Sequence, residues 1–514
     1  MNSRRLERAG LALLLAAGAL AGLGLGSLMP FGPGLRDDSS TYLMAAETLA
    51  RTGSYGRMTA LGEVRPVVNF PPMYSLALSL AERSGLPPLE ATRVLHQLLF
   101  AILVVATGAS LFAATRSPWA ASLGVVLVLV AVPLTIQFTW TQSEPLFLVL
   151  VEFGVLAAFL YRARRGGEWL LVLSGALFGV AAVTRYAGIG IACGVLVTLW
   201  AGSGKSRRLR DTLLFLPVAL LPLLLFLIRN GIVAGSAANR PSPFWHPPSF
   251  AAWASGAETV LTWVLPDRAV ALLGPAGSVA AAAVVATALG YVLVRLAADP
   301  PAWPRLSIEP LEMARLLSGA ILGYVATILV TAFVLDRLIP LNDRILAPVY
   351  YLILQLVTLG IAVLATSGRR VVILGVLLIA FLGMQGIRTA ALVRALRADG
   401  QGYRSREWRE SQVVRFVCEL PSVPIYSNDV PALYFACARI PFPLPSRINA
   451  ADLEPNPAYD AEVAAFEEAT QNRGGLVAIL GWYGEDRLDR IGASELVAGL
   501  RPFATFDDGV VYGR

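Results

Sequence analysis

Long apolar blocks separated by short polar segments fill most of the chain before residue 385. The blocks lie at residues 11–29, 95–114, 119–136, 145–161, 169–183, 188–200, 212–228, 272–296, 314–335, 345–365 and 371–384. A helix that crosses a bilayer needs roughly 17–25 mostly apolar residues, so the blocks at 169–183 and 188–200 are the least secure. The pattern predicts a polytopic α-helical membrane protein with about 11 transmembrane helices.

Arginines mark one end of these blocks. They precede the first block, and they recur in the loops that the block count places on the same side, at 116, 162–165, 207–210, 295, 305 and 369–370. Cytoplasmic loops are enriched in positive charge, so the N-terminus is expected inside. The first block exceeds a signal-peptide core of roughly 7–15 residues and no cleavage motif follows it, so we expect a retained span. An odd number of spans then places the C-terminus outside.

Composition supports this class. Of the 514 residues, 56% are hydrophobic and 15% are charged, whereas soluble proteins carry about 25% charged residues. These values exclude a soluble enzyme, a disordered protein and a disulfide scaffold. The net charge of +7 is better explained by cytoplasmic arginines than by nucleic-acid binding. Lys205 is the only lysine, and Ala, Gly and Leu are abundant, which suggests a GC-rich bacterial genome.

The residues from 388 to 514 have a different composition, with charges throughout and no apolar run long enough to span. Short apolar segments at 423–426, 475–480 and 509–512 predict strands, and 456–470 and 493–500 predict helices, the first with Pro457 at its start. We expect a soluble extracytoplasmic α/β domain here, after a transmembrane domain at 1–387. Cys418 and Cys437 either form a disulfide in an oxidising compartment or are two small buried residues, and their spacing leaves both open.

The first outer loop, at about 31–90, has the pattern of a structured segment. Asp37 and Asp38 precede an amphipathic stretch at 43–51 that Gly53 closes, and a stiff turn at 69–74 leads into a second such stretch to about residue 83. Asp38 or Ser39 would cap the first helix. The alternative is catalytic, because a carboxylate at the mouth of a membrane cavity can accept a proton from a hydroxyl or amine. The two amphipathic segments are expected to lie at the membrane interface.

Further polar residues lie on the same expected outer side. Glu144 either caps the helix that follows or lines a site, and Arg185 either reaches the headgroups or binds a lipid phosphate, as guanidinium groups do. His246 is either a base or a surface residue. The other outer-side candidates are Tyr186, Arg229, Arg240, Asp343 and Arg344. Several arginines facing a loop with paired acids indicate a cavity for a phosphorylated lipid. Two histidines (His96 and His246) and three cysteines leave no room for a His/Cys metal site.

The order of these motifs resembles the GT-C superfamily of membrane glycosyltransferases, in particular the bacterial branch near protein O-mannosyltransferases and lipid A aminoarabinose transferases. The similarity covers nearly the whole chain. Each motif is weak alone, but their order and their common position on the expected outer side add weight. The matching residues are Asp38-Ser39 with Tyr42, Gly53-x-Tyr55, Pro71-Pro72-x-Tyr74, Ser143-Glu144-Pro145-x-Phe147, Thr184-Arg185-Tyr186-x-Gly188, Arg229-Asn230 with Arg240, Asp343-Arg344 with Pro348, and Ile425 to Asp429 with Ala432 to Tyr434.

The resemblance implies an inverting transfer of a sugar from a polyprenyl-phosphate carrier outside the cytoplasmic membrane. It implies Asp38 as the base, with Asp37 as the second choice, because many relatives have Asp-Glu where this chain has Asp38-Ser39. Arg344 and Arg185 would bind the phosphate, with Arg229 and Arg240 as weaker candidates, and Glu144 and Tyr42 would shape the pocket. A divalent metal is possible but not expected. The acceptor is a glycan, a lipid or a protein. A transporter or flippase of lipid-linked sugars and a non-catalytic envelope assembly protein are the alternatives.

Overall fold

The structure is a computed structural model, which describes residues 3–163, 165–201, 203–237, 245–298, 308–336, 338–364, 368–448, 455–481 and 493–514. The chain forms two compact units. The helical unit comprises Met1–Leu28, Val68–Tyr74 and Ala91–Ala395, and the α/β unit comprises Met29–Val67, Ser75–Glu90 and Leu396–Arg514. Part of the first outer loop thus belongs to the same unit as the C-terminal residues. The functional boundary expected at 387/388 stays a prediction.

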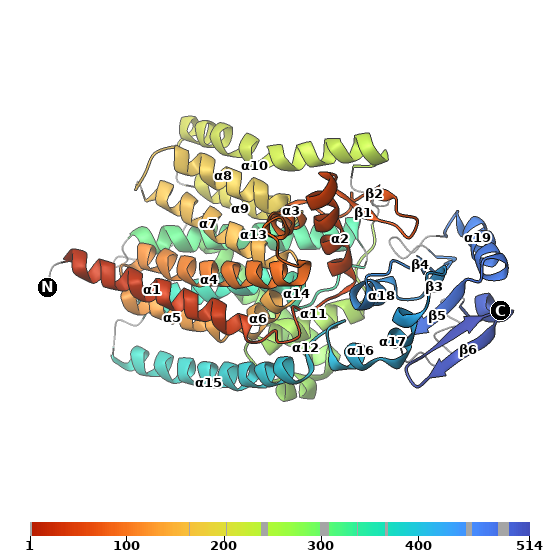
Figure 1. Cartoon of the computed structure of the whole chain (residues 1–514). Helices are drawn as coiled ribbons and strands as arrows, with labels where there is room; N and C mark the ends of the chain where they lie inside the picture. The colour runs from red at the N-terminus through yellow and green to blue at the C-terminus, as the bar shows by residue number, and fades with distance from the viewer. Residues whose placement is uncertain are drawn as a thin grey trace. The chain divides into compact units, whose positions relative to one another are not determined.

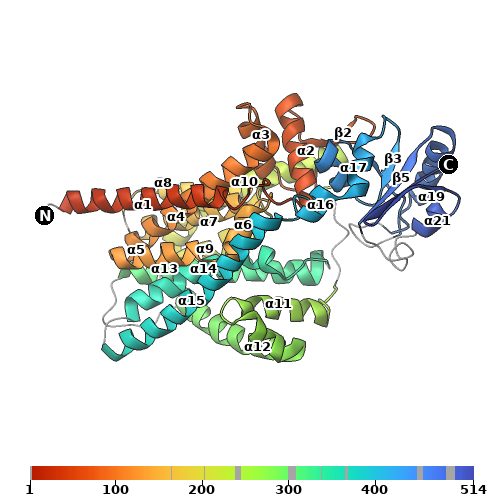
Figure 2. The same cartoon turned by 60° about the horizontal axis from the view of Figure 1, so that its bottom comes forward.

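Every apolar block of the sequence is helical in the helical unit, and Figures 1 and 2 show the long helices running along one another. The helices are α1 (Ser3–Gly26), α4 (Pro88–Thr115), α5 (Pro118–Leu129), α6 (Val132–Thr139), α7 (Glu144–Arg162), α8 (Trp169–Ala182), α9 (Gly188–Trp200), α10 (Lys205–Ala234), α11 (Phe250–Thr262), α12 (Asp267–Ala298), α13 (Ile308–Val330), the π-helical turn η1 (Thr331–Leu335), α14 (Asp343–Leu364) and α15 (Gly368–Asp399).

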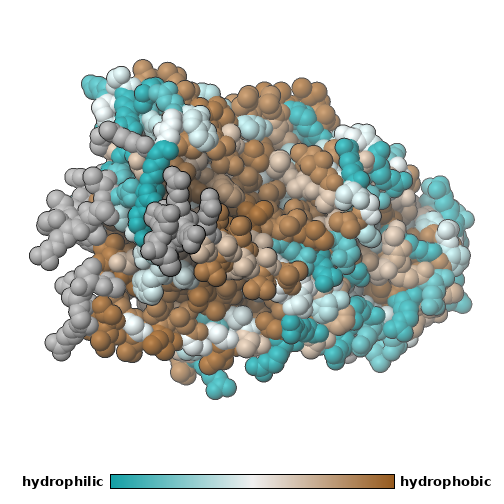
Figure 3. Space-filling model, turned by 60° about the vertical axis from the view of Figure 1, so that its left-hand side comes forward, coloured by the Kyte–Doolittle hydropathy of each residue, from teal (hydrophilic) through white to brown (hydrophobic). Residues whose placement is uncertain are grey.

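The lengths of these helices bear on the number of spans. Among the described residues, eight helices are long and apolar enough to cross a membrane, and α5 with α6, bent by 59°, makes a ninth if the pair is one span. Helices α8 and α9 have 14 and 13 residues, which is short for a span. The protein is a multi-pass helical membrane protein, as predicted, with large apolar areas on the face in Figure 3. The count of about 11 spans stays a prediction.

Glycines allow α9 and α13 to pack closely. Gly190 and Gly194 of α9 face Gly319 and Gly323 of α13, and a Cβ added at any of the four would collide with backbone of the other helix. Membrane helices commonly approach through small residues four positions apart, because packing rather than the hydrophobic effect holds them together. This contact places the middle of α13 beside the short helix α9.

Two glutamates at the start of α13 pair with arginines of the expected cytoplasmic side. Glu312 binds Arg162 of α7 with a distance of 3.0 Å between Oε2 and Nε, and Glu309 binds Arg165. The Arg162 and Glu312 side chains are 11% and 16% exposed, so water screens this pair only in part. These ion pairs tie the end of α7 to the beginning of α13.

The first outer loop contributes α2 (Asp37–Thr52), the hairpin of β1 (Gly56–Met58) and β2 (Val64–Pro66), and most of α3 (Met73–Glu82) to the α/β unit. Both predicted helices are present, but neither Asp38 nor Ser39 is the N-cap residue, and Ser39 caps from the third position of the helix. Arg36 occupies the N-cap position, and its N–H donates to Ser39 Oγ at 2.9 Å. The helix begins at Asp37, so both acids lie in its first turn, where the helix dipole favours negative charge. Gly53, with φ of 74°, ends the helix as expected.

A five-stranded sheet of order β4-β3-β5-β7-β6 forms the C-terminal part of the α/β unit. Its strands are β3 (Ile425–Ser427), β4 (Phe442–Pro443), β5 (Leu476–Leu480), β6 (Arg501–Phe506) and β7 (Gly509–Gly513). Alternation along β5 sends Ala478 and Leu480 to one face and Val477 and Ile479 to the other. The first face packs on α17 (Gln412–Glu419) and α18 (Val430–Cys437), and the second on α19 (Tyr459–Asn472) and α21 (Ala493–Val497). The predicted α/β class is confirmed.

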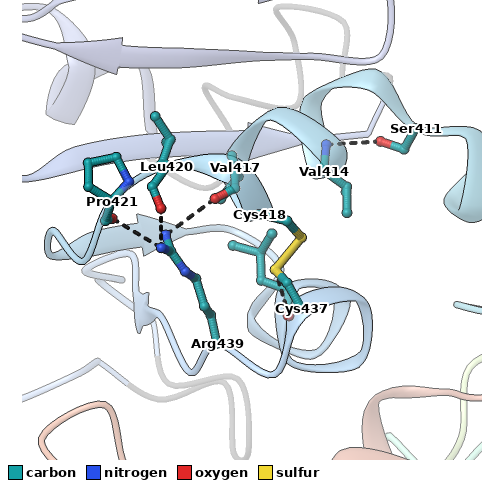
Figure 4. Close-up of a disulfide and its surroundings, with 9 residues drawn as sticks. Ser411, Val414, Val417, Cys418, Leu420, Pro421, Cys437 and Arg439 are labelled. Carbon is teal, nitrogen blue, oxygen red and sulfur yellow. Dashed lines mark hydrogen bonds between the residues drawn. A yellow bond between two sulfur atoms is a disulfide. The ribbon is translucent and has the colours of Figure 1, made fainter.

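Several elements of this sheet domain were not predicted. They are β4, β6, α17, α18 and the short helix α16 (Arg406–Glu410). The predicted helix at 456–470 begins later, at Tyr459, so Pro457 precedes it. The sequence left the state of Cys418 and Cys437 open, and the structure joins them in a disulfide between α17 and α18, with a Cα–Cα distance of 5.5 Å (Figure 4). Arg439 follows α18 and donates to the carbonyls of Val417, Leu420 and Pro421.

The disulfide predicts a thiol count. The chain has three cysteines, so the denatured, unreduced protein should take one thiol label, on Cys193, and the reduced protein should take three. Replacing both paired cysteines by serine should lower the free energy of unfolding of the α/β unit by about 3 kcal/mol, because the bond closes a loop of moderate length. Mass spectrometry of the labelled protein checks the count. Three labels without reduction would contradict the pairing.

Candidate functional site

Glu144 is the centre of the polar site in the helical unit. It is the first residue of α7, its side chain is fully buried, and its Oε1 accepts hydrogen bonds from the guanidinium groups of Arg185 and Arg344. The distance from Arg344 Nε to Glu144 Oε1 is 2.6 Å. A buried carboxylate needs such partners because it has lost its hydration. Two arginines and one glutamate leave an excess of one positive charge, which suits an anion.

Helix ends bring these three side chains together. Arg185 lies in the turn between α8 and α9, where its N–H donates to the Ala181 carbonyl at 2.8 Å. Its side chain is only 14% exposed, so the alternative in which it reaches out to the headgroups is wrong. Arg344 is the second residue of α14, and its N–H donates to Asn342 Oδ1 at 3.1 Å. The site therefore depends on three helix ends meeting at one point.

A buried tyrosine, Tyr324 of α13, supports this meeting point. Its hydroxyl donates to the Ile345 carbonyl at 2.7 Å, which holds the first turn of α14. The same hydroxyl interacts with Arg185. Tyr324 could not be predicted as a site residue, because a tyrosine within an apolar block has no distinguishing pattern.

The turn at Val68–Tyr74 is held against the rest of the helical unit by backbone and side-chain hydrogen bonds. The Val68 carbonyl accepts from the Tyr186 hydroxyl at 3.3 Å and from Asn230 Nδ2 at 3.0 Å. The Met73 N–H donates to the Val183 carbonyl at 3.0 Å. The Pro71-Pro72 pair stiffens the chain between these anchors. This turn is thus tied to the segment that carries Arg185.

His96 of α4 completes this anchor. Its Nε2 lies 2.8 Å from the Tyr74 hydroxyl, and its Nδ1 lies 3.0 Å from the Phe138 carbonyl oxygen. A carbonyl oxygen only accepts, so Nδ1 carries the proton, and Nε2 of a neutral ring accepts from Tyr74. Both side chains are fully buried. His96 was not among the predicted site residues, although an ionisable residue inside an apolar block is a signal of a functional or structural role.

The first-loop acids lie in the α/β unit. Asp37 Oδ1 accepts from the Tyr403 hydroxyl at 2.6 Å, and the same hydroxyl lies 2.9 Å from Asp429 Oδ1. Burial, and then the charge of Asp37, raise the pKa of Asp429, and burial, followed by the hydrogen bond to Asp37, raises the pKa of Tyr403. Asp38 is the next residue of α2. Tyr42 of the same helix is buried, and its carbonyl accepts from Ser75 Oγ at 3.1 Å.

The other predicted binding residues have separate surroundings. Asp343 accepts from Trp263 Nε1 at 3.2 Å, and Arg229 donates to Asn230 Oδ1 at 2.9 Å within α10, which continues past both residues instead of ending there. His246 donates its backbone N–H to the Phe333 carbonyl at 2.8 Å. Arg240 lies outside the described residues.

A second buried carboxylate, Glu152 of α7, is satisfied within the helical unit. It accepts from Ser110 Oγ at 2.5 Å, from Gln355 Nε2 at 2.7 Å and from the Tyr351 hydroxyl at 2.9 Å. These donors come from α4 and α14 and are neutral. We interpret Glu152 as a polar link between three helices, because hydrogen bonds between helices stabilise membrane bundles.

Comparisons with known proteins bear on the fold. No protein-family model matches the chain, and no curated protein matches its sequence. The crystal structure of ArnT from Cupriavidus metallidurans bound to undecaprenyl phosphate matches with a TM-score of 0.56 and 12% identity, over 99% of this chain and 98% of that chain. Its apo state gives 0.52 and 15%, over 100% and 98%. The Archaeoglobus fulgidus oligosaccharyltransferase in complex with Zn and sulfate gives 0.55 and 14%, over 91% and 68%.

These structural neighbours are GT-C glycosyltransferases. At such low identities the likeness establishes the fold, and the chain therefore has the GT-C fold. The resemblance inferred from the order of its motifs is confirmed at this level. Within the described ranges, no three His, Cys, Asp or Glu side chains form a group that could hold a metal ion.

The paired arginines predict the effect of neutralising Glu144. Glu144→Gln keeps the shape of the side chain but leaves two buried guanidinium groups without their counter-charge, and it should lower the free energy of unfolding by about 3 kcal/mol. Glu468→Gln removes an exposed pair with Arg473 and should change it by less than about 1 kcal/mol. Thermal unfolding in detergent compares the two. The double variant Glu144→Gln/Arg344→Gln should recover part of the lost stability. Equal stability of Glu144→Gln and the control Glu468→Gln would contradict the role of Glu144 as the buried counter-charge of the two arginines.

Proposed function

We propose that the protein is an inverting glycosyltransferase that moves a sugar from a polyprenyl-phosphate carrier to an envelope acceptor. The observation that carries the proposal is the meeting of Arg185 and Arg344 at the buried Glu144 carboxylate. The three groups carry an excess of positive charge in a multi-pass membrane protein. A lipid phosphate is the anion that matches both properties, because its head needs guanidinium donors and its tail needs the bilayer.

The structural neighbours agree with this reading. ArnT from Cupriavidus metallidurans, whose fold the chain shares along nearly its whole length, was crystallised with undecaprenyl phosphate. By analogy, a polyprenyl phosphate is the expected carrier here. Fold analogy alone does not define an activity. The charge arrangement at Glu144 is the local observation that supports extending the carrier assignment from ArnT to this chain.

The chemistry needs few groups. The acceptor oxygen or nitrogen attacks the anomeric carbon from the side opposite the carrier, the bond between that carbon and the phosphate oxygen breaks, and its electron pair remains on the phosphate. Arg185 and Arg344 would stabilise the charge that develops on the phosphate. Asp38 would take the proton from the acceptor. One inversion requires no carboxylate nucleophile, and we assign no metal to the reaction.

The remaining candidates have supporting roles in this proposal. Glu144 would hold both arginines in place while the phosphate enters and leaves. Tyr186 and Tyr74 would fix the turn at Val68–Tyr74. Tyr186 donates to the Val68 carbonyl at one end of the turn, and Tyr74 at the other end binds His96. Arg229 would orient the Asn230 amide that binds the same turn. Tyr42, Asp343, His246 and Arg240 stay candidate binding residues.

We infer a bacterial inner-membrane location with the transfer at its outer face, where residues 388–514 would form an extracytoplasmic domain. The positive loops support this orientation. The disulfide between Cys418 and Cys437 supports it independently, because such bonds persist in oxidising compartments. The acceptor is a glycolipid, a polysaccharide or a protein, and the donor sugar is a hexose or a pentose.

Release of polyprenyl phosphate tests the activity. The purified protein is given a panel of polyprenyl-phospho-sugars and an extract of outer-face envelope acceptors, and released carrier phosphate is measured. Wild type should release it from one donor only, and Asp38→Asn should reduce the rate by roughly 100-fold or more, because it removes the base. Asp460→Asn is the matched control. It replaces an acid at the same position of another helix, the second residue of α19, and should leave the rate unchanged.

The outcomes separate the proposal from its alternatives. Donor-specific release that depends on Asp38 supports a transferase. Carrier binding without release, together with movement of the intact lipid between leaflets of a vesicle, would indicate a transporter or flippase. An Asp38→Asn variant as active as wild type would overturn Asp38 as the base.

A further inference from the structure

The Tyr403 hydroxyl joins two acidic residues of the α/β unit that are distant in sequence. It lies 2.6 Å from Asp37 Oδ1, and 2.9 and 3.2 Å from Asp429 Oδ1 and Oδ2. Asp37 is the first residue of α2, and Asp429 is the N-cap of α18. A link of three side chains therefore connects the acidic start of the first outer-loop helix to the C-terminal sheet domain.

The number of protons restricts how this link works. A phenol carries one O–H and donates one hydrogen bond, and an ionised carboxylate only accepts. Two ionised carboxylates would divide this one donor between them, whereas a carboxyl that carries a proton can itself donate to the phenol oxygen and leave the O–H for the other. Burial raises the pKa of Asp429, hydrogen bonds from the Ala432 amide and Tyr403 lower it, and the charge of Asp37 raises it again; the net direction is upward, which favours a proton on Asp429.

Tyr403 is held rigidly enough to fix its partners. Its ring packs edge-on against Trp408 at 5.1 Å between centroids and at a tilt against Phe435 at 5.6 Å. Its N–H donates to the Leu35 carbonyl at 3.1 Å, two residues before Asp37. Backbone and side chain of one residue thus both bind the segment that leads into α2.

Asp429 is fixed in the same way. Its Oδ1 accepts from the Ala432 N–H at 3.0 Å, which caps α18, and its own N–H donates to Ser427 Oγ at 3.1 Å. The disulfide at Cys437 anchors the other end of α18 to α17 (Figure 4). The bridge therefore rests on a helix that is secured at both ends.

We propose that Tyr403 and Asp429 are positioning residues for the acidic start of α2: the Tyr403 hydroxyl and one shared proton hold Asp37, and this fixes the direction of Asp38. The choice of Asp38 as the group to be directed rests on the proposed function. Successive residues of a helix point about 100° apart, so holding Asp37 on the Tyr403 side turns Asp38 to a different side. Asp37 is then part of the support and is not the base.

The bridge is tested first without turnover, by amide hydrogen exchange of α2 in the full-length protein. Tyr403→Phe removes the hydroxyl alone and should speed exchange in the first turns of α2 about tenfold, as expected for lost hydrogen bonds to a charged group. Tyr426→Phe is the control, because it removes a hydroxyl of the same domain that binds the Ala465 carbonyl instead of α2. Unchanged α2 exchange in Tyr403→Phe, or equal changes in both variants, would overturn the proposal.

The shared proton is tested by the pH dependence of the same exchange, corrected for its intrinsic rate. The groups that act on Asp429 are Asp37, Tyr403 and the Ala432 amide. Because its pKa is raised in the folded state, protection of α2 should be full at low pH and fall as pH rises through that pKa. Asp429→Asn keeps a neutral donor and the cap, so protection should remain and lose this pH dependence. Asp429→Ala should lose protection at every pH, and a wild-type profile without pH dependence would contradict the shared proton.

Turnover then separates support from chemistry. Asp37→Asn and Tyr403→Phe should each lower kcat about tenfold or less, and the double variant should be no worse than either, since both break one bridge. Asp38→Asn should be far more damaging. Loss of activity in Asp37→Asn with an active Asp38→Asn would make Asp37 the base and overturn the assignment. If wild type shows no transfer, the proposed function fails, and the exchange results still decide whether the bridge holds α2.

Discussion

The ionic contact of Glu144 with Arg185 and Arg344 is the constraint on which the helical unit depends. Two guanidinium groups stabilise the buried Glu144 carboxylate, so the ends of three separate helical segments meet at that point. Tyr324 and the close packing of α9 on α13 hold two of these segments together. Two arginines around one glutamate also leave an excess positive charge. The contact can therefore hold the helices together and still attract an anion such as a phosphate.

The turn between α8 and α9 places Arg185 beside Glu144. Helices α8 and α9 have only 14 and 13 residues, and the turn between them leaves backbone groups available for hydrogen bonds from other segments. The turn at Val68–Tyr74 binds here, because Met73 donates to the Val183 carbonyl and Tyr186 binds the Val68 carbonyl. The segment between these two short helices therefore holds that turn in the helical unit.

The sequence predicted the long helices and part of the sheet because both depend on local patterns. Apolar length marks each long helix, and short apolar runs mark β5 and β7, whereas β6 carries Arg501 and Pro502, is largely exposed and has no such pattern. For the site, the sequence predicted individual residues but not which of them contact one another. Asp343 and Arg344 are adjacent in sequence, yet one binds Trp263 and the other Glu144, which only the helix geometry decides. Tyr403 lies 366 positions from Asp37, beyond any local signal.

The central claim is that the arginines at Glu144 bind the phosphate of a lipid carrier. The most direct measurement is a ³¹P NMR titration of undecaprenyl phosphate bound to the purified protein, compared between wild type and Arg344→Gln. Two nearby guanidinium groups favour the dianion, so the second pKa of the bound phosphate should lie about one unit or more below that of the lipid in empty micelles, and Arg344→Gln should reverse most of this shift. An identical titration in wild type, in the variant and in empty micelles would contradict the claim.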